Sequence, residues 1–266
     1  MTEAADAPLL DVRDLVTRFE TDGGGELRAV DGVSFAMRAG TTLGVVGESG
    51  SGKSVTALSI LRLVRDPPGR VVGGQVLFRG RDLDRMSIPA RSRAGLVRTF
   101  QTPQVFPNLT VQENIMAGCY KRTASGMTAG LLGTPGARAD LAHMRASADA
   151  ACERFGLASV RDQLAGKLPG GQQRLVELAR ACVAEPVLLC LDEPSSGLNS
   201  EEVARLMQTL QRLNSEGLTI LLVSHDMDLV TIAHQIHVLC FGEIIASGAL
   251  PHIQSDARVR EAYLGV

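Results

Sequence analysis

Hydrophobic and polar residues alternate at the start of the chain with the period of a half-buried strand. The alternation covers residues 9–19 and 27–37, and a Gly-rich turn at 23–25 separates the two runs. This pattern predicts an antiparallel hairpin. Two further strands are predicted over the apolar runs 42–47 and 75–78.

The middle of the chain, from about residue 86 to 171, has a mainly helical pattern. The clearest helices are predicted over 110–120 and 138–155, with a Gly-rich apolar loop at 126–136 between them.

Short buried strands alternate with helices in the C-terminal part of the chain. Helices are predicted over 171–184, 201–214 and 227–234, and strands over 187–191, 218–224 and 236–241. This alternation predicts a parallel, doubly wound sheet. We therefore expect one α/β domain over residues 1–266. Its core would comprise 1–90, beginning with the antiparallel β subdomain, and 172–266, interrupted by a helical subdomain at about 91–171.

Composition narrows the function classes. With 27 Lys and Arg against 29 Asp and Glu, the net charge is -2, so we expect no nucleic-acid partner. The apolar runs are far shorter than the ~18 residues of a membrane span, and the start lacks the features of a signal peptide. The five cysteines form no CxxC pair. Neither a disulfide framework nor a zinc site is therefore expected, and the chain is predicted to be cytosolic.

A phosphate-binding loop is predicted between the strand at 42–47 and the helix that follows. The loop reads Gly47, Glu48, Ser49, Gly50, Ser51, Gly52, Lys53 and Ser54, with Val55 next in the helix, and fits the P-loop pattern. Its backbone N–H groups would bind phosphate, Lys53 would lie between the β- and γ-phosphates, and Ser54 would coordinate Mg²⁺. The alternative is a Gly-rich turn before a helix. The pattern alone does not separate kinases, GTPases and ATPases.

Two adjacent carboxylates, Asp192 and Glu193, end an apolar strand. At the carboxyl edge of a parallel sheet, Asp192 would direct Mg²⁺ and Glu193 would polarise a water towards the γ-phosphate. Alternatively, the pair caps the helix expected after Pro194.

Three single residues also end predicted strands. Gln101 ends the strand-like run 96–101, His225 directly follows the strand at 218–224, and Phe19 ends the first strand. Phe19 offers a face for stacking on adenine, or it is ordinary core. Without a role in a site, Gln101 is a solvated polar residue at a strand end, and His225 is a histidine at the edge of the core.

A Gly pair opens the helix predicted near residue 171. Residues Pro169, Gly170, Gly171 and Gln172 lie at its start, where free backbone N–H groups and the helix dipole favour an anion. The alternative is a tight turn before an amphipathic helix.

In their order and spacing, these motifs resemble those of the ATPase subunits of ATP-binding cassette (ABC) transporters. The segments are GESGSGKS, RTFQ, LPGGQQ, VLLCLDEP, SSGLN and VSHD, and the resemblance covers essentially the whole chain. It implies a P-loop NTPase core with an inserted helical subdomain, and ATP with Mg²⁺ bound between the P-loop of one subunit and the signature, residues 168–173, of another. It also implies that Gln101 joins the Mg²⁺ shell, His225 contacts the γ-phosphate, Glu193 polarises the attacking water and Phe19 stacks on adenine.

Within the family, different segments of the chain resemble two subfamilies. Residues 29–63 resemble oligopeptide-importer ATPases, whereas RTFQTPQVFPNLTVQENIMAG, LDEPSSGLN and VREAYLG resemble branched-chain amino-acid importer ATPases. The second resemblance covers more of the chain and is preferred. Two positions depart from the family pattern: Pro169 replaces the signature serine, and Asn199 replaces an aspartate.

The resemblance also implies partners: a second ABC ATPase subunit, integral-membrane permease subunits and, indirectly, an extracytoplasmic substrate-binding protein. The protein is then expected at the cytoplasmic face of the membrane, with the permease near Gln101 and residues 102–108. The rival is an ABC ATPase that acts on ribosomes or DNA. Such proteins usually carry two cassettes or long coiled coils, and neither is visible here.

Overall fold

The computed structural model describes residues 7–21, 23–122 and 127–264. An antiparallel sheet has the strand order β2-β1-β4-β5. Its strands are β1 (Leu10–Glu20), β2 (Glu26–Met37), β4 (Gly69–Phe78) and β5 (Arg81–Asp82). The predicted hairpin is confirmed: β1 and β2 pair antiparallel, with Phe19 opposite Leu27.

The second sheet has the order β10-β9-β3-β8-β7-β6. Its strands are β3 (Thr42–Val46), β6 (Leu96–Arg98), β7 (Leu188–Asp192), β8 (Thr219–Val223), β9 (Gln235–Cys240) and β10 (Glu243–Gly248). The pairs from β9 to β6 are parallel, as predicted. Strand β10, which the sequence analysis did not predict, adds antiparallel to β9. β3, β7 and β8 are buried along their whole length, which explains their continuous apolar pattern.

Helix α1 (Lys53–Ile60) packs between the two sheets. Its Ala57 and Ile60 are 1% exposed and share one core with Val12 of β1 and Val45 of β3. This core fixes the antiparallel sheet beside the loop that precedes α1.

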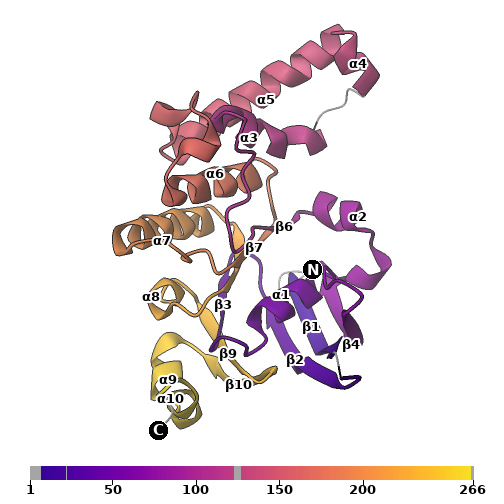
Figure 1. Cartoon of the computed structure of the whole chain (residues 1–266), viewed down its shortest axis with the longest axis vertical. Helices are drawn as coiled ribbons and strands as arrows, with labels where there is room; N and C mark the ends of the chain where they lie inside the picture. The colour runs from indigo at the N-terminus through magenta and orange to yellow at the C-terminus, as the bar shows by residue number, and fades with distance from the viewer. Residues whose placement is uncertain (1–6, 22, 123–126, 265–266) are drawn as a thin grey trace, which may run out of the picture.

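The helical region comprises α2 (Ile88–Arg93), α3 (Val111–Met116), α4 (Met127–Leu131), α5 (Pro135–Arg154) and α6 (Gly170–Cys182). The pair α4 and α5 projects from the molecule (Figure 1). The loop predicted at 126–136 is corrected in part: residue 126 lies outside the described residues, and Met127–Leu131 forms α4. The next helix begins at Pro135 because the Thr134 side chain caps its N-terminus. The domain boundaries stay a prediction, although β6 places residues 96–98 in the parallel sheet.

The C-terminal helices are α7 (Ser200–Ser215), α8 (Met227–Val230), α9 (Leu250–Ser255) and α10 (Ala257–Leu264). Helix α8 ends at Val230, earlier than predicted. The N–H groups of Thr231, Ile232 and Ala233 bond to the third preceding residue, which gives tighter turns than those of an α-helix. Among the described residues, no helix combines the length and the apolar character needed to cross a membrane.

Candidate nucleotide site

Three neighbouring strands bring the predicted residues to one edge of the parallel sheet. Val223 of β8 lies opposite Val45 of β3 and Asp192 of β7. Because the strands are parallel, their carboxyl ends meet there. The loop after β3, the carboxylates that end β7 and the histidine after β8 therefore converge. The strand ends predicted this edge for the carboxylates, whereas the family resemblance implied it for His225.

The loop from Gly47 to Ser54 wraps around the ammonium group of Lys53. Nζ of Lys53 donates to the carbonyl oxygens of Gly47 and Glu48, both at 2.7 Å. Gly52 has φ +98, and a Cβ there would lie 2.2 Å from the carbonyl oxygen of Ala29. Only glycine fits this position, so the loop can pass close to β2 and start α1 directly.

Lys53 is 6% exposed. Burial lowers its pKa, and the nearby carboxylates of Glu193, Asp192 and Glu48 oppose that change. Oε1 of Glu193 lies 3.9 Å from Nζ. A cation with carbonyl contacts and one distant carboxylate is poised to bind an added anion.

Asp192 is held between a hydroxyl and a guanidinium group. Ser54 Oγ donates to Asp192 Oδ1 at 3.0 Å, and Arg98 Nη2 donates to Oδ2 at 2.8 Å. Asp192 is 2% exposed. The hydroxyl and carboxylate oxygens are hard donors of the kind that Mg²⁺ prefers, so these residues fit that ion.

Glu193 is fixed by His225. Oε2 of Glu193 lies 2.6 Å from Nδ1 of His225 and accepts from the backbone N–H of His225 at 3.3 Å. Glu193 has φ +47, a strained backbone region for this residue type. The alternative that the carboxylates cap a helix is wrong, because α7 begins later and Asn199 is its N-cap.

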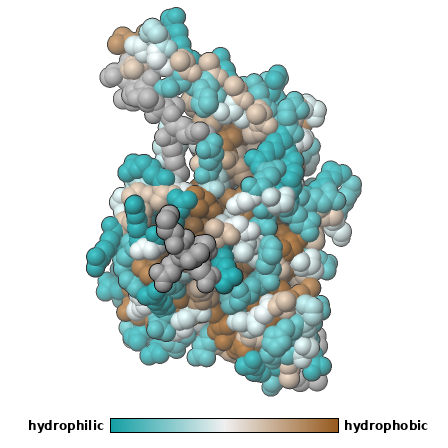
Figure 2. All heavy atoms as spheres, turned by 180° about the vertical axis from the view of Figure 1, so that it is seen from behind, coloured by the Kyte–Doolittle hydropathy of each residue, from teal (hydrophilic) through white to brown (hydrophobic). Residues whose placement is uncertain are grey.

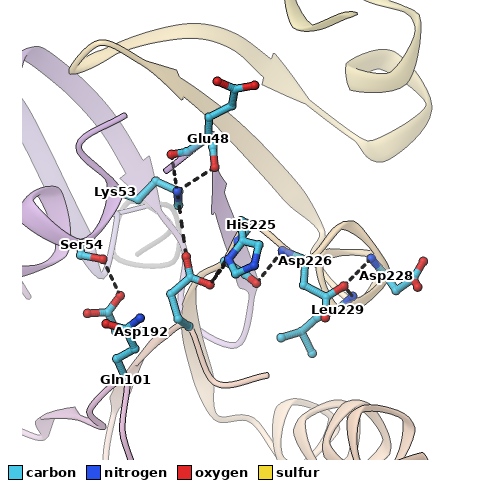
Figure 3. Close-up of polar contacts among 12 residues, drawn as sticks. Glu48, Lys53, Ser54, Gln101, Asp192, His225, Asp226, Asp228 and Leu229 are labelled. Atoms are coloured by element: carbon cyan, nitrogen blue, oxygen red, sulfur yellow. Dashed lines mark hydrogen bonds and ion pairs between the residues drawn. The ribbon is translucent and has the colours of Figure 1, made fainter. Parts of the chain in front are cut away.

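A cavity of about 1050 Å³ opens along this edge. Twelve of the predicted residues line it: Phe19, Gly47, Glu48, Ser49, Gly50, Gly52, Lys53, Ser54, Val55, Gln101, Glu193 and His225. Figure 3 shows Lys53 joined to Glu48, and Ser54 joined to Asp192, by polar contacts. Ser51 and Asp192 are buried beneath the lining. The roles assigned to these residues remain predictions.

The sequence analysis missed three residues. Leu27 and Ala29 line the cavity beside Phe19, and Arg98 holds Asp192. A signal existed for Leu27, since the hairpin register places it opposite Phe19. Arg98 lies in the RTFQ segment but was given no role, and its pairing with β7 depends on the sheet order.

The signature segment lies outside the lining of this cavity. Among the described residues, none of Pro169, Gly170, Gly171 and Gln172 lines this cavity. Pro169 is the N-cap of α6 and its side chain makes no capping hydrogen bond. Glu202 of α7 packs on Gly171, where a Cβ would lie 2.3 Å from Oε1 of Glu202. Glu202 also forms a capping box with Asn199, so Asn199 has a structural role at the start of α7.

The described geometry can be compared with known proteins. The model of the ABC transporter family matches residues 30–196, more than half of the chain. The chain belongs to the ABC transporter family. Members of this family hydrolyse ATP, so this ABC protein is an ATPase, and the fold predicted from the motifs is confirmed.

Curated ABC relatives match nearly the whole chain. The high-affinity branched-chain amino acid transport ATP-binding protein LivG of Salmonella typhimurium is 36% identical over 260 residues, 97% of this chain and 98% of its own length. BraF of Pseudomonas aeruginosa, of the same description, is 33% identical over the same shares of both chains. A putative peptide import ATP-binding protein of Brucella abortus is 34% identical and covers 93% of this chain and 73% of its own.

Solved ABC structures share the fold. A nucleotide-free ATP-binding cassette from an ABC transporter matches with a TM-score of 0.80 and 29% identity over 98% of this chain and 100% of its own. The ADP conformation of the cassette MJ1267 matches with a TM-score of 0.79 and 27% identity over the same shares.

Proposed function

We propose that this chain is the ATP-hydrolysing subunit of an importer for branched-chain or related amino acids, working at the cytoplasmic face of the cell membrane. The observation that carries the proposal is the 36% identity to a branched-chain amino acid transport protein over 97% of this chain and 98% of the relative. The match runs through both the core strands and the helical region.

ATP would occupy the cavity at the carboxyl edge of the sheet. Its adenine would pack on Phe19 and Leu27, and its phosphates would lie in the loop of residues 47–54. Lys53 would exchange its carbonyl contacts for phosphate oxygens, because hydrogen bonds between two charged groups are stronger than those to a carbonyl.

Mg²⁺ would be held by Ser54, Asp192 and Gln101. When bound, the ion neutralises charge on the phosphates. Arg98 fixes Oδ2 of Asp192 and leaves Oδ1 directed at Ser54. Gln101 is exposed and lines the cavity, so its amide oxygen can complete the set.

The two oxygens of Glu193 suit it for hydrolysis. Oε2 is held by His225, while Oε1 faces Lys53 and the P-loop. Oε1 can therefore orient a water towards the terminal phosphate and accept its proton. The His225 side chain is 64% exposed, and it can contact the same phosphate from the mouth of the cavity.

The site is proposed to be completed by a second ATPase subunit, either a copy of this chain or a paralogue. The signature at the start of α6 lies outside the cavity of its own chain. A head-to-tail partner would bring its signature over the open side of the cavity, where backbone N–H groups of Gly170 and Gly171 can bind the terminal phosphate.

A second cavity suits the permease. It measures about 780 Å³ and lies between α2, β6 and α6. Exposed hydrophobic side chains line it, including Ile88, Phe100 and Phe106. Brown hydrophobic surface gathers near the middle of the face shown in Figure 2. The segment 102–108 borders this groove, and an extracytoplasmic substrate-binding protein would act through the permease.

Uptake into vesicles tests the proposal. The chain would be reconstituted into proteoliposomes with the permease subunits and the substrate-binding protein of its complex. We expect ATP-dependent uptake of leucine, isoleucine or valine, and none with Glu193→Gln. Uptake of an oligopeptide instead would favour the second candidate, which the 34% identity to a peptide import protein supports. ATP hydrolysis without uptake of any branched-chain amino acid would contradict the proposal.

A further inference from the structure

A buried ion pair on α6 lies outside the nucleotide cavity. Arg174 and Glu177 are one helical turn apart, and their side chains are 1% and 3% exposed. Nη1 of Arg174 lies 2.8 Å from Oε2 of Glu177. Burying two charges is costly unless their remaining donors and acceptors are also satisfied. The partners of this pair therefore show what it holds in place.

Those partners are backbone groups of the segment that contains Gln101. Arg174 donates to the carbonyl oxygen of Phe100 at 2.6 Å and to the carbonyl oxygen of Gln101. Oε1 of Glu177 accepts from the backbone N–H groups of Phe100 at 3.2 Å and Gln104 at 3.4 Å. We call Arg174 and Glu177 the α6 clamp. It bonds both polar backbone groups of Phe100 and one of Gln101.

The chain passes from the sheet to the clamp between Thr99 and Phe100. The N–H of Thr99 donates to the carbonyl oxygen of Cys190 at 3.0 Å, which continues the pairing of β6 with β7. From Phe100 onwards, the backbone bonds to α6 instead. Gln101 is therefore positioned by α6 rather than by the strand that precedes it.

The N-terminus of helix α6 carries the signature. The helix has 13 residues and begins at Gly170, so both clamp residues lie within about two turns of rigid helix from the signature. In the head-to-tail dimer of the proposed function, the signature serves the nucleotide of the partner. Gln101 serves the nucleotide of its own chain.

We propose that Arg174 and Glu177 are positioning residues that couple the two nucleotide sites. The clamp moves Gln101 together with the signature helix of the same chain. When that signature engages the nucleotide bound to the partner, Gln101 is placed for hydrolysis of the nucleotide bound to its own chain. The inference rests on the dimer of the proposed function. Coupling of this kind between two sites makes hydrolysis cooperative.

The test uses the full chain without permease. The variant Arg174→Met/Glu177→Met replaces the buried pair with apolar side chains of similar length, a change that buried ion pairs often tolerate. The matched control is Arg205→Met/Glu201→Met, an exposed pair on α7 whose N–O distance is 2.6 Å. Thermal unfolding verifies that each variant is folded, and ADP affinity verifies that the P-loop half of the site is intact.

Three results are expected for the clamp variant. Hydrogen exchange at the amides of Phe100 and Gln104 becomes faster. The Hill coefficient for ATP hydrolysis falls from above 1 in the wild type to about 1. The kcat falls ~10–10²-fold through misplacement of Gln101, with ADP affinity unchanged. The control pair shows none of these changes.

If the double variant does not fold, Glu177→Gln is measured instead. It keeps the side-chain shape and one acceptor but removes the charge that faces Arg174, and we expect a lower Hill coefficient here too. A folded variant with the cooperativity of the wild type would overturn the inference, as would a wild type with a Hill coefficient of 1. Amino-acid uptake is not involved in these measurements, so a failure of the importer proposal is distinguished by the vesicle assay.

Discussion

Nδ1 of His225 lies 2.6 Å from Oε2 of Glu193, across the ends of the neighbouring strands β8 and β7. Glu193 is 6% exposed, whereas the side chain of His225 is 64% exposed. The histidine thus connects a buried carboxylate to the mouth of the cavity. It fixes one oxygen of Glu193 and leaves the other facing Lys53.

Removing this contact should slow hydrolysis more than it weakens binding. His225→Ala removes the imidazole contact and leaves Glu193 only the longer contact with the backbone N–H. The carboxylate is then less well oriented, so we expect kcat to fall ~10–10²-fold with little change in KM. Steady-state hydrolysis at saturating ATP measures this. His252→Ala on α9, an exposed histidine outside the cavity, is the control. A kcat equal to that of the wild type would show that His225 does not orient the carboxylate.

The sequence predicted best the placement of residues that lie close together along the chain. Gly52, Lys53 and Ser54 follow a strand and start a helix, so their place in the cavity lining is determined within one short segment. Strand β10 was missed because its pairing is decided by β9 across a turn. Arg98 was missed because its partner, Asp192, comes from a strand far along the chain.

A substitution at Phe106 tests the groove between α2, β6 and α6 that we propose binds the permease. The backbone N–H of Phe106 donates to the buried Asn114 at 2.8 Å. The residue is 50% exposed, and the guanidinium carbon of Arg180 lies 5.4 Å from the centre of its ring. Phe106→Asp keeps these backbone bonds and adds a charge to an apolar groove. We expect co-purification with the permease to be lost while ATP affinity is unchanged.

The matched control for the groove is Val72→Asp, an exposed aliphatic position on β4 outside the groove. It should bind the permease like the wild type. If Phe106→Asp and Val72→Asp were captured equally by the permease, the docking surface would have to lie elsewhere.

Pro169 should weaken the signature half of the dimer. Proline has no N–H and no hydroxyl, and a serine at this N-cap would offer the facing phosphate a charge-assisted hydrogen bond worth ~1.5–3 kcal/mol. We expect Pro169→Ser to tighten ATP-driven dimerisation and raise turnover severalfold at the site it completes. Sedimentation and hydrolysis by the reconstituted complex measure both. If neither changes, the amides of Gly170 and Gly171 already suffice.

Stability at acid pH should depend on His237 of β9. It is 4% exposed, its Nδ1 lies 2.6 Å from Oγ of Ser247, and burial lowers its pKa to about 4. In the unfolded chain the pKa is about 6.5. The unfolded state therefore binds more protons between these values, and the free energy of unfolding falls as pH drops from about 6.5 to 4.

This loss reaches about 3 kcal/mol at pH ~4. His237→Gln carries no titrating group, so its free energy of unfolding should fall less steeply over the same range. Urea unfolding between pH ~7 and ~4 compares the two slopes. Parallel curves for variant and wild type would contradict the buried, neutral histidine.

ATP hydrolysis by Glu193→Gln tests the central claim most directly. A carboxylate that orients and deprotonates water contributes ~10²–10⁴-fold to the rate. The variant should lose turnover by this factor, retain the ATP affinity of the wild type and form a stable dimer with ATP. Lys53→Ala should instead lose nucleotide affinity, because it removes a ground-state phosphate contact. Steady-state hydrolysis by Glu193→Gln at the wild-type rate would contradict the catalytic role of Glu193.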